Sequence, residues 1–273
     1  MIDFSDEEFK DFLKYTFTDH HHDFTNYAQE SLKRRVEFAL VNMNIDSLFE
    51  LKKKLSCSPN LIGQLIQYMT VSTTEMFRDP QFFITFREKI VPILKTYPYP
   101  KIWIAGCSTG EEILSYCILL EEDGLLDKVS IYATDINNIS LKTAKDGIYK
   151  LSKMKTYSQN YLLAKGKKSL SDYYHVEYDF AIFNKRLLQN VTFSNHCLAT
   201  DYSFSDFQFI SCRNVLIYFN RELQNRTVGL FYDSLVDLGF LALGSREDIR
   251  FTGFSNQFEI YENQIFFRKN FHK

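Results

Sequence analysis

The fold class of this 273-residue chain is decided by the stretch Lys101-Ile102-Trp103-Ile104-Ala105-Gly106-Cys107-Ser108-Thr109-Gly110-Glu111-Glu112. Its first five residues form a short apolar run that predicts a buried β-strand, and a helix is predicted from Glu111 to about Glu122. The glycines between them allow the backbone to approach a ligand closely, and the N–H groups at the helix start are available to polar ligand atoms. The stretch therefore predicts a strand, a ligand-binding loop and a helix.

A second strand and an acidic residue support this interpretation. Residues 129–134 are predicted to form the strand, and Asp135 ends it 25 residues after Gly110 (135 − 110). A carboxylate in this place can accept both hydroxyl protons of a ribose. Further strands are predicted at 207–211, 238–243 and 264–268. Because strands alternate with helices, we expect an open, mostly parallel sheet covered on both faces, with ligands outside the carboxyl ends of its strands.

The acidic side chains after the glycines indicate the kind of nucleotide. Gly106 and Gly110 do not fit the GxGxxG pattern of dinucleotide-binding loops, and alone they are weak support for any ligand. Glu111 and Glu112 would repel a pyrophosphate, whereas the ammonium and sulfonium groups of S-adenosylmethionine would attract a carboxylate. We therefore expect S-adenosylmethionine as the cofactor, with Glu111 as a contact, while Glu112 is better explained by the helix macrodipole.

The overall composition excludes several classes of protein. A formal charge of −2 gives no electrostatic case for binding nucleic acid. No window approaches the roughly 18 apolar residues of a membrane span. The five scattered cysteines show neither metal-site nor disulfide spacing, so we expect reduced thiols and a cytoplasmic location. We interpret His20-His21-His22 as a loop without a metal, because adjacent histidines cannot all face one ion in regular structure.

The chain divides into two expected domains. Residues 1–72 show helical periodicity and no strand pattern, and the expected α/β domain spans residues 73–273. A small β insertion is expected within 155–193, with short strands between Tyr173 and Phe183. The helices predicted in the first domain are 7–17, 31–40, 46–55 with Asp46 as its cap, and 61–69.

Two further segments carry a family resemblance. They are Thr74-Glu75-Met76-Phe77-Arg78-Asp79-Pro80 and Cys212-Arg213-Asn214-Val215-Leu216-Ile217-Tyr218-Phe219. Each sets a polar group, Arg78 or Tyr218, in aromatic surroundings that suit a carboxylate held beside a sulfonium methyl group. Together with the glycine loop, they resemble signature segments of the CheR family, the chemotaxis receptor methyltransferases. The resemblance extends over nearly the whole chain and also rests on residues 26–27, 31–36, 103–112, 133–137 and 146–149.

The resemblance implies a Rossmann-like S-adenosylmethionine-dependent methyltransferase domain preceded by a small all-helical N-terminal domain. The implied reaction is methylation of glutamate side chains on the cytoplasmic helices of chemoreceptors, which gives glutamyl methyl esters for adaptation. Arg78 and Tyr218 would orient the substrate carboxylate, and the basic segment Lys33, Arg34 and Arg35 would dock the acidic receptor helices. The implied cofactor contacts are Ser72, Thr74, Arg78, Ala105, Gly106, Glu111, Asp135, Cys197, Leu198, Arg213 and Asn214.

Some features depart from the family pattern and leave other functions open. The family often has Asn at the positions of Ser72 and Cys197, and residues 155–193 show no recognisable motif for docking a receptor's C-terminal peptide. The Ser72 and Cys197 departures motivate a non-catalytic, cofactor-binding signalling regulator. The intact Arg78, Asp135 and Tyr218 oppose it. A methyltransferase of the same fold that acts on another substrate is a further alternative. A nicotinamide-dependent oxidoreductase is disfavoured by the missing GxGxxG pattern and by Glu111.

Overall fold

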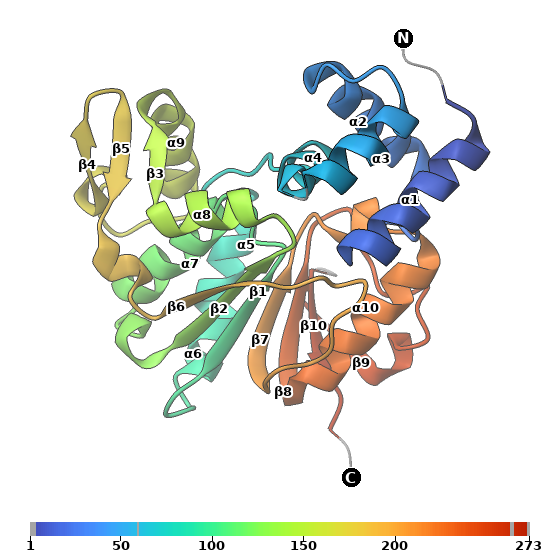
Figure 1. Ribbon diagram of the computed structural model, residues 1–273. Helices are drawn as coiled ribbons and strands as arrows, with labels where there is room; N and C mark the ends of the chain where they lie inside the picture. The colour runs from blue at the N-terminus through green and yellow to red at the C-terminus, as the bar shows by residue number, and fades with distance from the viewer. Residues whose placement is uncertain (1–3, 59, 263–264, 272–273) are drawn as a thin grey trace.

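The computed structural model describes residues 4–58, 60–262 and 265–271, in which a group of N-terminal helices precedes an α/β domain (Figure 1). The N-terminal helices correspond to the predicted ones. The third is capped by Ser47 rather than Asp46, because the Ser47 side chain accepts the Glu50 N–H. Apolar residues from each helix meet in one buried cluster. The bounds of these helices are α1 Asp6–His20, α2 Gln29–Asn42, α3 Leu48–Cys57 and α4 Leu61–Met69.

The α/β domain is built on a seven-stranded sheet with the order β6-β2-β1-β7-β8-β10-β9. Neighbours from β6 to β8 run parallel, and β10 pairs antiparallel with both β8 and β9. The five predicted strands correspond to β1, β2, β7, β8 and β10, although residue 264 of the last lies outside the described residues. The bounds are β1 Lys101–Ala105, β2 Ser130–Asp135, β6 Val191–Asn195, β7 Phe207–Cys212, β8 Leu235–Leu243, β9 Phe258–Glu262 and β10 Phe266–Lys269.

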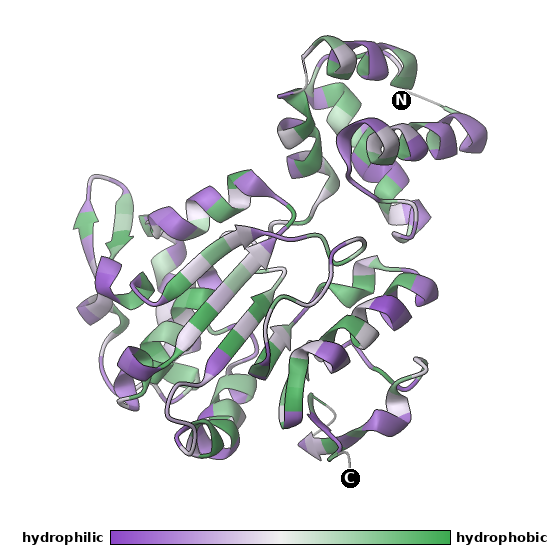
Figure 2. Cartoon of the chain, turned by 60° about the horizontal axis from the view of Figure 1, so that its bottom comes forward, coloured by the Kyte–Doolittle hydropathy of each residue, from purple (hydrophilic) through white to green (hydrophobic). Residues whose placement is uncertain are grey.

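Both faces of the sheet are covered, as the side-chain alternation of β1 shows. Ile102 and Ile104 belong to the buried cluster on one face, and Trp103 and Ala105 belong to the cluster on the other. Hydrophobic residues accordingly run along the central strands (Figure 2). The covering elements are α5 Pro80–Thr85, the π-helical η1 Phe86–Ile90, α6 Val91–Leu94, α7 Glu111–Glu122, η2 Leu126–Lys128, α8 Asn138–Asp146, η6 Leu216–Tyr218, α10 Arg221–Ser234 and η7 Ser255–Gln257.

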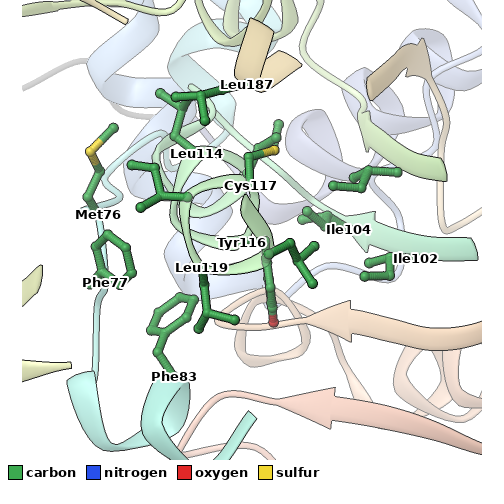
Figure 3. Packing of buried hydrophobic residues seen from close by; sticks show 14 of the residues in the cluster. Met76, Phe77, Phe83, Ile102, Ile104, Leu114, Tyr116, Cys117, Leu119 and Leu187 are labelled. Carbon is green, nitrogen blue, oxygen red and sulfur yellow. The ribbon is translucent and has the colours of Figure 1, made fainter. Parts of the chain in front are cut away.

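Helix α7 is the central element of the larger cluster. Every residue from Ile113 to Leu120 is buried, and Figure 3 shows the side chains of Leu114, Tyr116 and Leu119 pointing in different directions into the surrounding core. A helix that is apolar on all sides must be buried by its neighbours, and the sheet, α5 and α9 accordingly pack around α7. Even so, within the described part of the chain no helix is both long and apolar enough to cross a membrane.

The segment between β2 and β6 carries a separate three-stranded sheet with the order β3-β5-β4. The strands predicted between Tyr173 and Phe183 correspond to β4 and β5, but the sheet also uses β3, which precedes the expected insertion, and residues 191–193 belong to β6 in the main sheet. The elements are β3 Ile148–Lys150, η3 Leu151–Lys153, α9 Met154–Leu163, η4 Leu170–Tyr173, β4 Tyr174–Glu177, β5 Phe180–Phe183 and η5 Lys185–Leu188.

We predict that Thr134→Val lowers the free energy of unfolding by about 1–3 kcal/mol, the usual cost of an unpaired buried donor. The indole Nε1–H of Trp103 donates to Thr134 Oγ1 over 2.8 Å, and both residues are buried. Trp103 is the single tryptophan of the chain, so its fluorescence reports urea unfolding directly. Thr143→Val is the control, because its hydroxyl donates to the carbonyl of Ile139 in an exposed hydrogen bond on the surface of α8. Equal effects of the two changes would contradict the prediction.

Candidate active site

A cleft opens beyond the carboxyl ends of β1, β2 and β7 and encloses about 1100 Å³, including the solvent at its mouth. The chain leaves β1 toward β2 on one side and later returns to β7 on the other, so the cleft lies at a point where the strand order reverses. Open α/β sheets bind ligands at such points. The N-terminal helices contribute Tyr27, Ser31 and Arg35 to the opposite wall. The site is therefore shared between the sheet and the N-terminal helices.

The loop after β1 requires glycine at position 106. Gly106 has φ +72°, and a Cβ added there would lie 2.5 Å from Cγ2 of Val215. The backbone N–H groups of Gly106 and Cys107 both donate to the Thr134 carbonyl, over 2.8 and 2.9 Å. The loop is thus pressed between the end of β2 and the loop after β7. Its position depends on the absence of a side chain.

Asp135 lies on the cleft at the end of β2, where the sequence predicted an acidic residue. Its Oδ2 accepts the Ser108 N–H over 2.8 Å, and its Oδ1 accepts the Asn137 N–H over 2.9 Å. Burial raises the pKa of this carboxyl group, although these backbone N–H donors act in the opposite direction. Each oxygen keeps a lone pair for a further donor, so the carboxylate can still bind a ligand diol.

The two glutamates at the start of α7 lie in different surroundings, and this corrects the prediction for Glu111. The Glu111 side chain is fully buried outside the cleft lining and bonds Tyr157 and Lys153. Glu112 lines the cleft instead, where its Oε1 accepts the Ser211 hydroxyl over 2.7 Å. Neighbouring helical residues point about 100° apart, so only one of them can face the loop. Glu112 is thus the residue that can meet a cation in the cleft.

The guanidinium of Arg213 connects three parts of the site. Its Nη1 lies 3.2 Å from Oε2 of Glu112, and its Nη2 lies 2.9 Å both from Oδ2 of Asp79 and from the carbonyl oxygen of Arg78. The group also stacks on Phe82, with 4.0 Å from Cζ to the ring centroid. The Arg213 side chain is 1% exposed, so these contacts replace the hydration of Nη1 and Nη2, while the buried Nε has no hydrogen-bond partner within the described residues. Although Arg213 lines the cleft, its main role is to hold these three parts of the site together.

Arg78 is held in the cleft by a constrained backbone. Its neighbours Phe77 and Asp79 both have positive φ, at 52° and 59°, and the Phe77 N–H donates to the buried Ser115 hydroxyl over 2.8 Å. Such conformations are uncommon for residues other than glycine and persist only where surrounding contacts impose them. The half-buried Arg78 side chain lines the cleft, and no ion pair or hydrogen bond of its guanidinium occurs within the described residues.

The loop that carries Tyr218 is supported by a buried carboxylate that the sequence patterns missed. Glu247 accepts the N–H groups of Gly244 and Asn214, each over 2.7 Å, and of Ile217 over 3.2 Å. Burial raises the pKa of Glu247, and the three donors oppose the shift. Asn214, which has φ +60°, and Tyr218 both line the cleft. No local periodicity could have identified Glu247, because Asn214 and Ile217, its partners in this loop, lie some thirty positions earlier.

The N-terminal helices are joined directly to the same loop. The Ala28 N–H donates to the Tyr218 carbonyl over 2.8 Å, and the Tyr27 ring packs edge-on against Phe219 at a centroid distance of 4.9 Å. The guanidinium of Arg35 lies 5.9 Å from the centroid of the Tyr218 ring. Residues of the first helices thus complete the site, and of these only the basic segment was predicted to be functional.

The predicted basic segment does not form one surface. Arg35 lines the cleft, and its Nη1 donates to the Thr70 carbonyl over 3.2 Å. Arg34 is exposed and bonds the carbonyl of Glu30 on its own helix, and Lys33 pairs with Asp6 of α1. The three side chains diverge because successive helical residues differ by about 100°.

The remaining predicted contacts separate into two groups. Ser72, Thr74 and Leu198 line the cleft together with His196, which sequence reasoning missed. Ala105 and Cys197 are buried but do not belong to its lining. The cofactor contact implied for Cys197 is therefore not reproduced by its side chain.

Comparisons with known proteins agree with this geometry. Residues 72–267 match the family model described as CheR methyltransferase, SAM binding domain. A Pseudomonas putida protein, named provisionally as the methyltransferase Cher3, is 48% identical over 95% of this chain and 93% of its own length. A chemotaxis protein methyltransferase of Listeria innocua is 31% identical over 83% and 84%, and chemotaxis protein methyltransferase 1 of Vibrio cholerae is 29% identical over 95% and 94%.

The solved structures that match are more distant. PKMT2 of Rickettsia typhi, in complex with AdoHcy, is 18% identical and covers 54% of this chain and 21% of its own. Its TM-score of 0.33 is too low to support an argument about the site.

We predict that Gly106→Ala weakens binding of S-adenosylhomocysteine by at least roughly tenfold, because the new Cβ would displace Val215 and its backbone would be strained. Adding Val215→Ala should restore part of the affinity, since it removes the obstructing methyl but leaves the positive φ. Gly63→Ala is the matched control, because a Cβ there would meet nothing within 4 Å. Titration calorimetry measures all three variants. Unchanged affinity in Gly106→Ala would refute the role of the loop.

Proposed function

Because the chain belongs to the CheR methyltransferase family, we propose that it methylates glutamate side chains on the cytoplasmic helices of chemoreceptors, with S-adenosylmethionine as the methyl donor. The products would be glutamyl methyl esters and S-adenosylhomocysteine, formed in the cytoplasm. The names of the relatives from Listeria innocua and Vibrio cholerae support the chemotaxis assignment. The main support from the structure is the placement of Arg78 and of Tyr218 on the same cleft as Asp135 and the glycine loop.

The residues present fit a positively charged nucleoside cofactor. Asp135 can accept the ribose hydroxyls, and Glu112 can attract an ammonium group from the other side of the glycine loop. Two carboxylates on one cleft wall would repel a phosphate chain, which disfavours a nicotinamide dinucleotide. The cofactor supplies an electrophilic methyl group bound to a sulfonium sulfur.

In the proposed reaction a carboxylate oxygen of the substrate bonds to the methyl carbon while the carbon–sulfur bond breaks. A glutamate carboxylate is already ionised at neutral pH, so the site needs no general base. Arg78 would orient the carboxylate through a charge-assisted hydrogen bond, and Tyr218 would donate one hydrogen bond and exclude water. Rate enhancement would come mainly from in-line positioning.

A basic helix beside the cleft supports a helical, acidic protein as the substrate. Arg35 reaches the cleft next to Tyr218, and Arg34 lies exposed on the same helix. Acidic residues on a receptor helix would complement these charges and bring the substrate glutamate toward the cleft. In this proposal Arg35 acts at the entrance, and Arg34 acts in docking.

The proposal is tested by titrating the protein with S-adenosylhomocysteine and, in parallel, with NADH. Micromolar binding of the first compound alone is the expected result. Incubation with labelled S-adenosylmethionine and chemoreceptor cytoplasmic fragments should then give base-labile methyl groups on glutamates. Cofactor binding without transfer to any receptor would favour a regulator or a methyltransferase with another substrate.

We predict that Arg78→Ala and Tyr218→Phe each lower turnover by roughly tenfold to a hundredfold, the usual loss when a reacting group is misplaced. Their dissociation constants for S-adenosylhomocysteine should change less than turnover. Arg186→Ala is the control, because this arginine is exposed on η5 and pairs with Asp127 far from the cleft lining. Wild-type turnover in both site variants would exclude this assignment of roles.

We predict that affinity for S-adenosylhomocysteine falls as the pH is lowered, starting at a higher pH than an ordinary aspartate would give. The protonated form of Asp135 accepts fewer hydrogen bonds from the ribose, and burial raises the pKa of this group. Because its pKa is raised, Asp135 binds a proton more tightly in the folded state than in the unfolded chain. This group therefore stabilises the unliganded fold at low pH, and that stabilisation is lost as the pH rises. Protonation of Asp135 cannot lower the affinity by unfolding the protein.

The variant Asp135→Asn provides the control for this pH dependence. It should bind S-adenosylhomocysteine more weakly than the wild type and with little change over the same pH range, since an amide does not titrate. Calorimetric titrations at neutral and mildly acidic pH measure both proteins. A flat profile for the wild type, or wild-type affinity in Asp135→Asn, would contradict the assigned contact with ribose.

A further inference from the structure

We define the inserted segment as residues 148–188, from β3 to η5. Its helix α9 contacts both ends of α7 through two tyrosines. The hydroxyl of Tyr157 donates to Oε1 of Glu111, the first residue of α7, over 2.9 Å. The hydroxyl of Tyr161, one helical turn later, donates to Glu122, the last residue of α7. Both tyrosines are buried, at 2% and 3% exposure. Only the first of them is bonded to the end of α7 that adjoins the glycine loop.

Three groups outside the cleft lining bind the Glu111 carboxylate, and Tyr157 is one of them. Lys153 Nζ lies 3.1 Å from Oε1, and the hydroxyl of Thr109 donates to Oε2 over 2.6 Å. Because Glu111 is 0% exposed, its charge depends on these donors for stabilisation. Thr109 belongs to the glycine loop, while Lys153 and Tyr157 belong to the inserted segment. The carboxylate therefore bridges the two.

A second contact reinforces this bridge. The hydroxyl of Tyr149, in β3, donates to the carbonyl of Thr109 over 2.8 Å. The same hydroxyl would lie 3.0 Å from a Cβ added at Gly110, and the Ala144 Cα would lie 2.7 Å from it. The inserted segment thus packs against the back of the loop, on the side away from the cleft. Residues of the insertion can set the loop position without touching a ligand.

We propose that Tyr157 is a positioning residue for the cofactor loop, acting through the Glu111 carboxylate. Its hydroxyl holds Glu111, Glu111 holds Thr109, and this arrangement presents the loop between Gly106 and Gly110 to the cofactor. The inference rests on the proposed role of the loop in binding S-adenosylmethionine. It assigns Glu111 an indirect role in place of the direct contact predicted from the sequence.

The matched variants Tyr157→Phe and Tyr161→Phe test this inference. Each removes one buried hydroxyl from α9 and its hydrogen bond to a glutamate of α7, so both should lower the melting temperature. Tyr161→Phe also removes the acceptor of the Lys168 N–H, so its effect on the melting temperature should be at least as large. Only Tyr157→Phe should raise the dissociation constant for S-adenosylhomocysteine, by about fivefold or more, the lower end of typical coupling between sites. Tyr161→Phe should remain within about twofold of the wild type. Calorimetry is done below the melting temperature of every variant.

The alternative result is an unchanged dissociation constant in Tyr157→Phe, or an equal increase in both variants, and either would overturn the inference. The effects of Glu111→Gln and Tyr157→Phe should also be less than additive, because both act through one carboxylate. If Tyr157→Phe does not fold, Lys153→Met removes the half-exposed donor to the same oxygen. Failure of the wild type to bind S-adenosylhomocysteine would contradict the proposed function, whereas wild-type binding with unaffected variants contradicts only this inference.

Discussion

The buried guanidinium of Arg213 is the interaction on which the cleft depends. It follows β7, pairs with Glu112 at the start of α7, and bonds Asp79 and the carbonyl of Arg78 ahead of α5. A buried charge is tolerated only when its partners are correctly placed, because its lost hydration must be replaced. The three segments that form the site therefore have one compatible arrangement, and the wall with the glycine loop and Arg78 are positioned together.

Around this centre the protein maintains a strained backbone. Phe77, Asp79 and Asn214 adopt positive φ, which costs on the order of 1–3 kcal/mol at a residue other than glycine. Each is held by a specific contact: Ser115 accepts the Phe77 N–H, Arg213 binds Asp79, and Glu247 accepts the Asn214 N–H. The strain lies in the two segments that carry Arg78 and Tyr218, as expected where geometry serves a reaction.

Apart from Arg213, whose guanidinium pairs with Glu112, the charged side chains of the cleft are arranged by sign. Carboxylates of Glu112 and Asp135 lie beside the glycine loop, and the cations of Arg78 and Arg35 lie on segments that come from the N-terminal side of the chain. A cationic cofactor and an anionic substrate would meet between them, which is the arrangement a methyl transfer to a carboxylate needs. The inserted segment contributes from behind the loop, so it can influence cofactor binding without narrowing the cleft.

The sequence by itself determined β1, β2, β7 and the helix faces, because hydrophobic periodicity is a local property. It also determined that Asp135 ends a strand beside a glycine loop. Strands β6 and β9 escaped this reasoning, since few of their residues are buried and both become strands through pairing with neighbours. Only the tertiary structure decided which of Glu111 and Glu112 faces the cleft. Adjacent helical residues differ in direction, and the partners that hold each one come from distant parts of the chain.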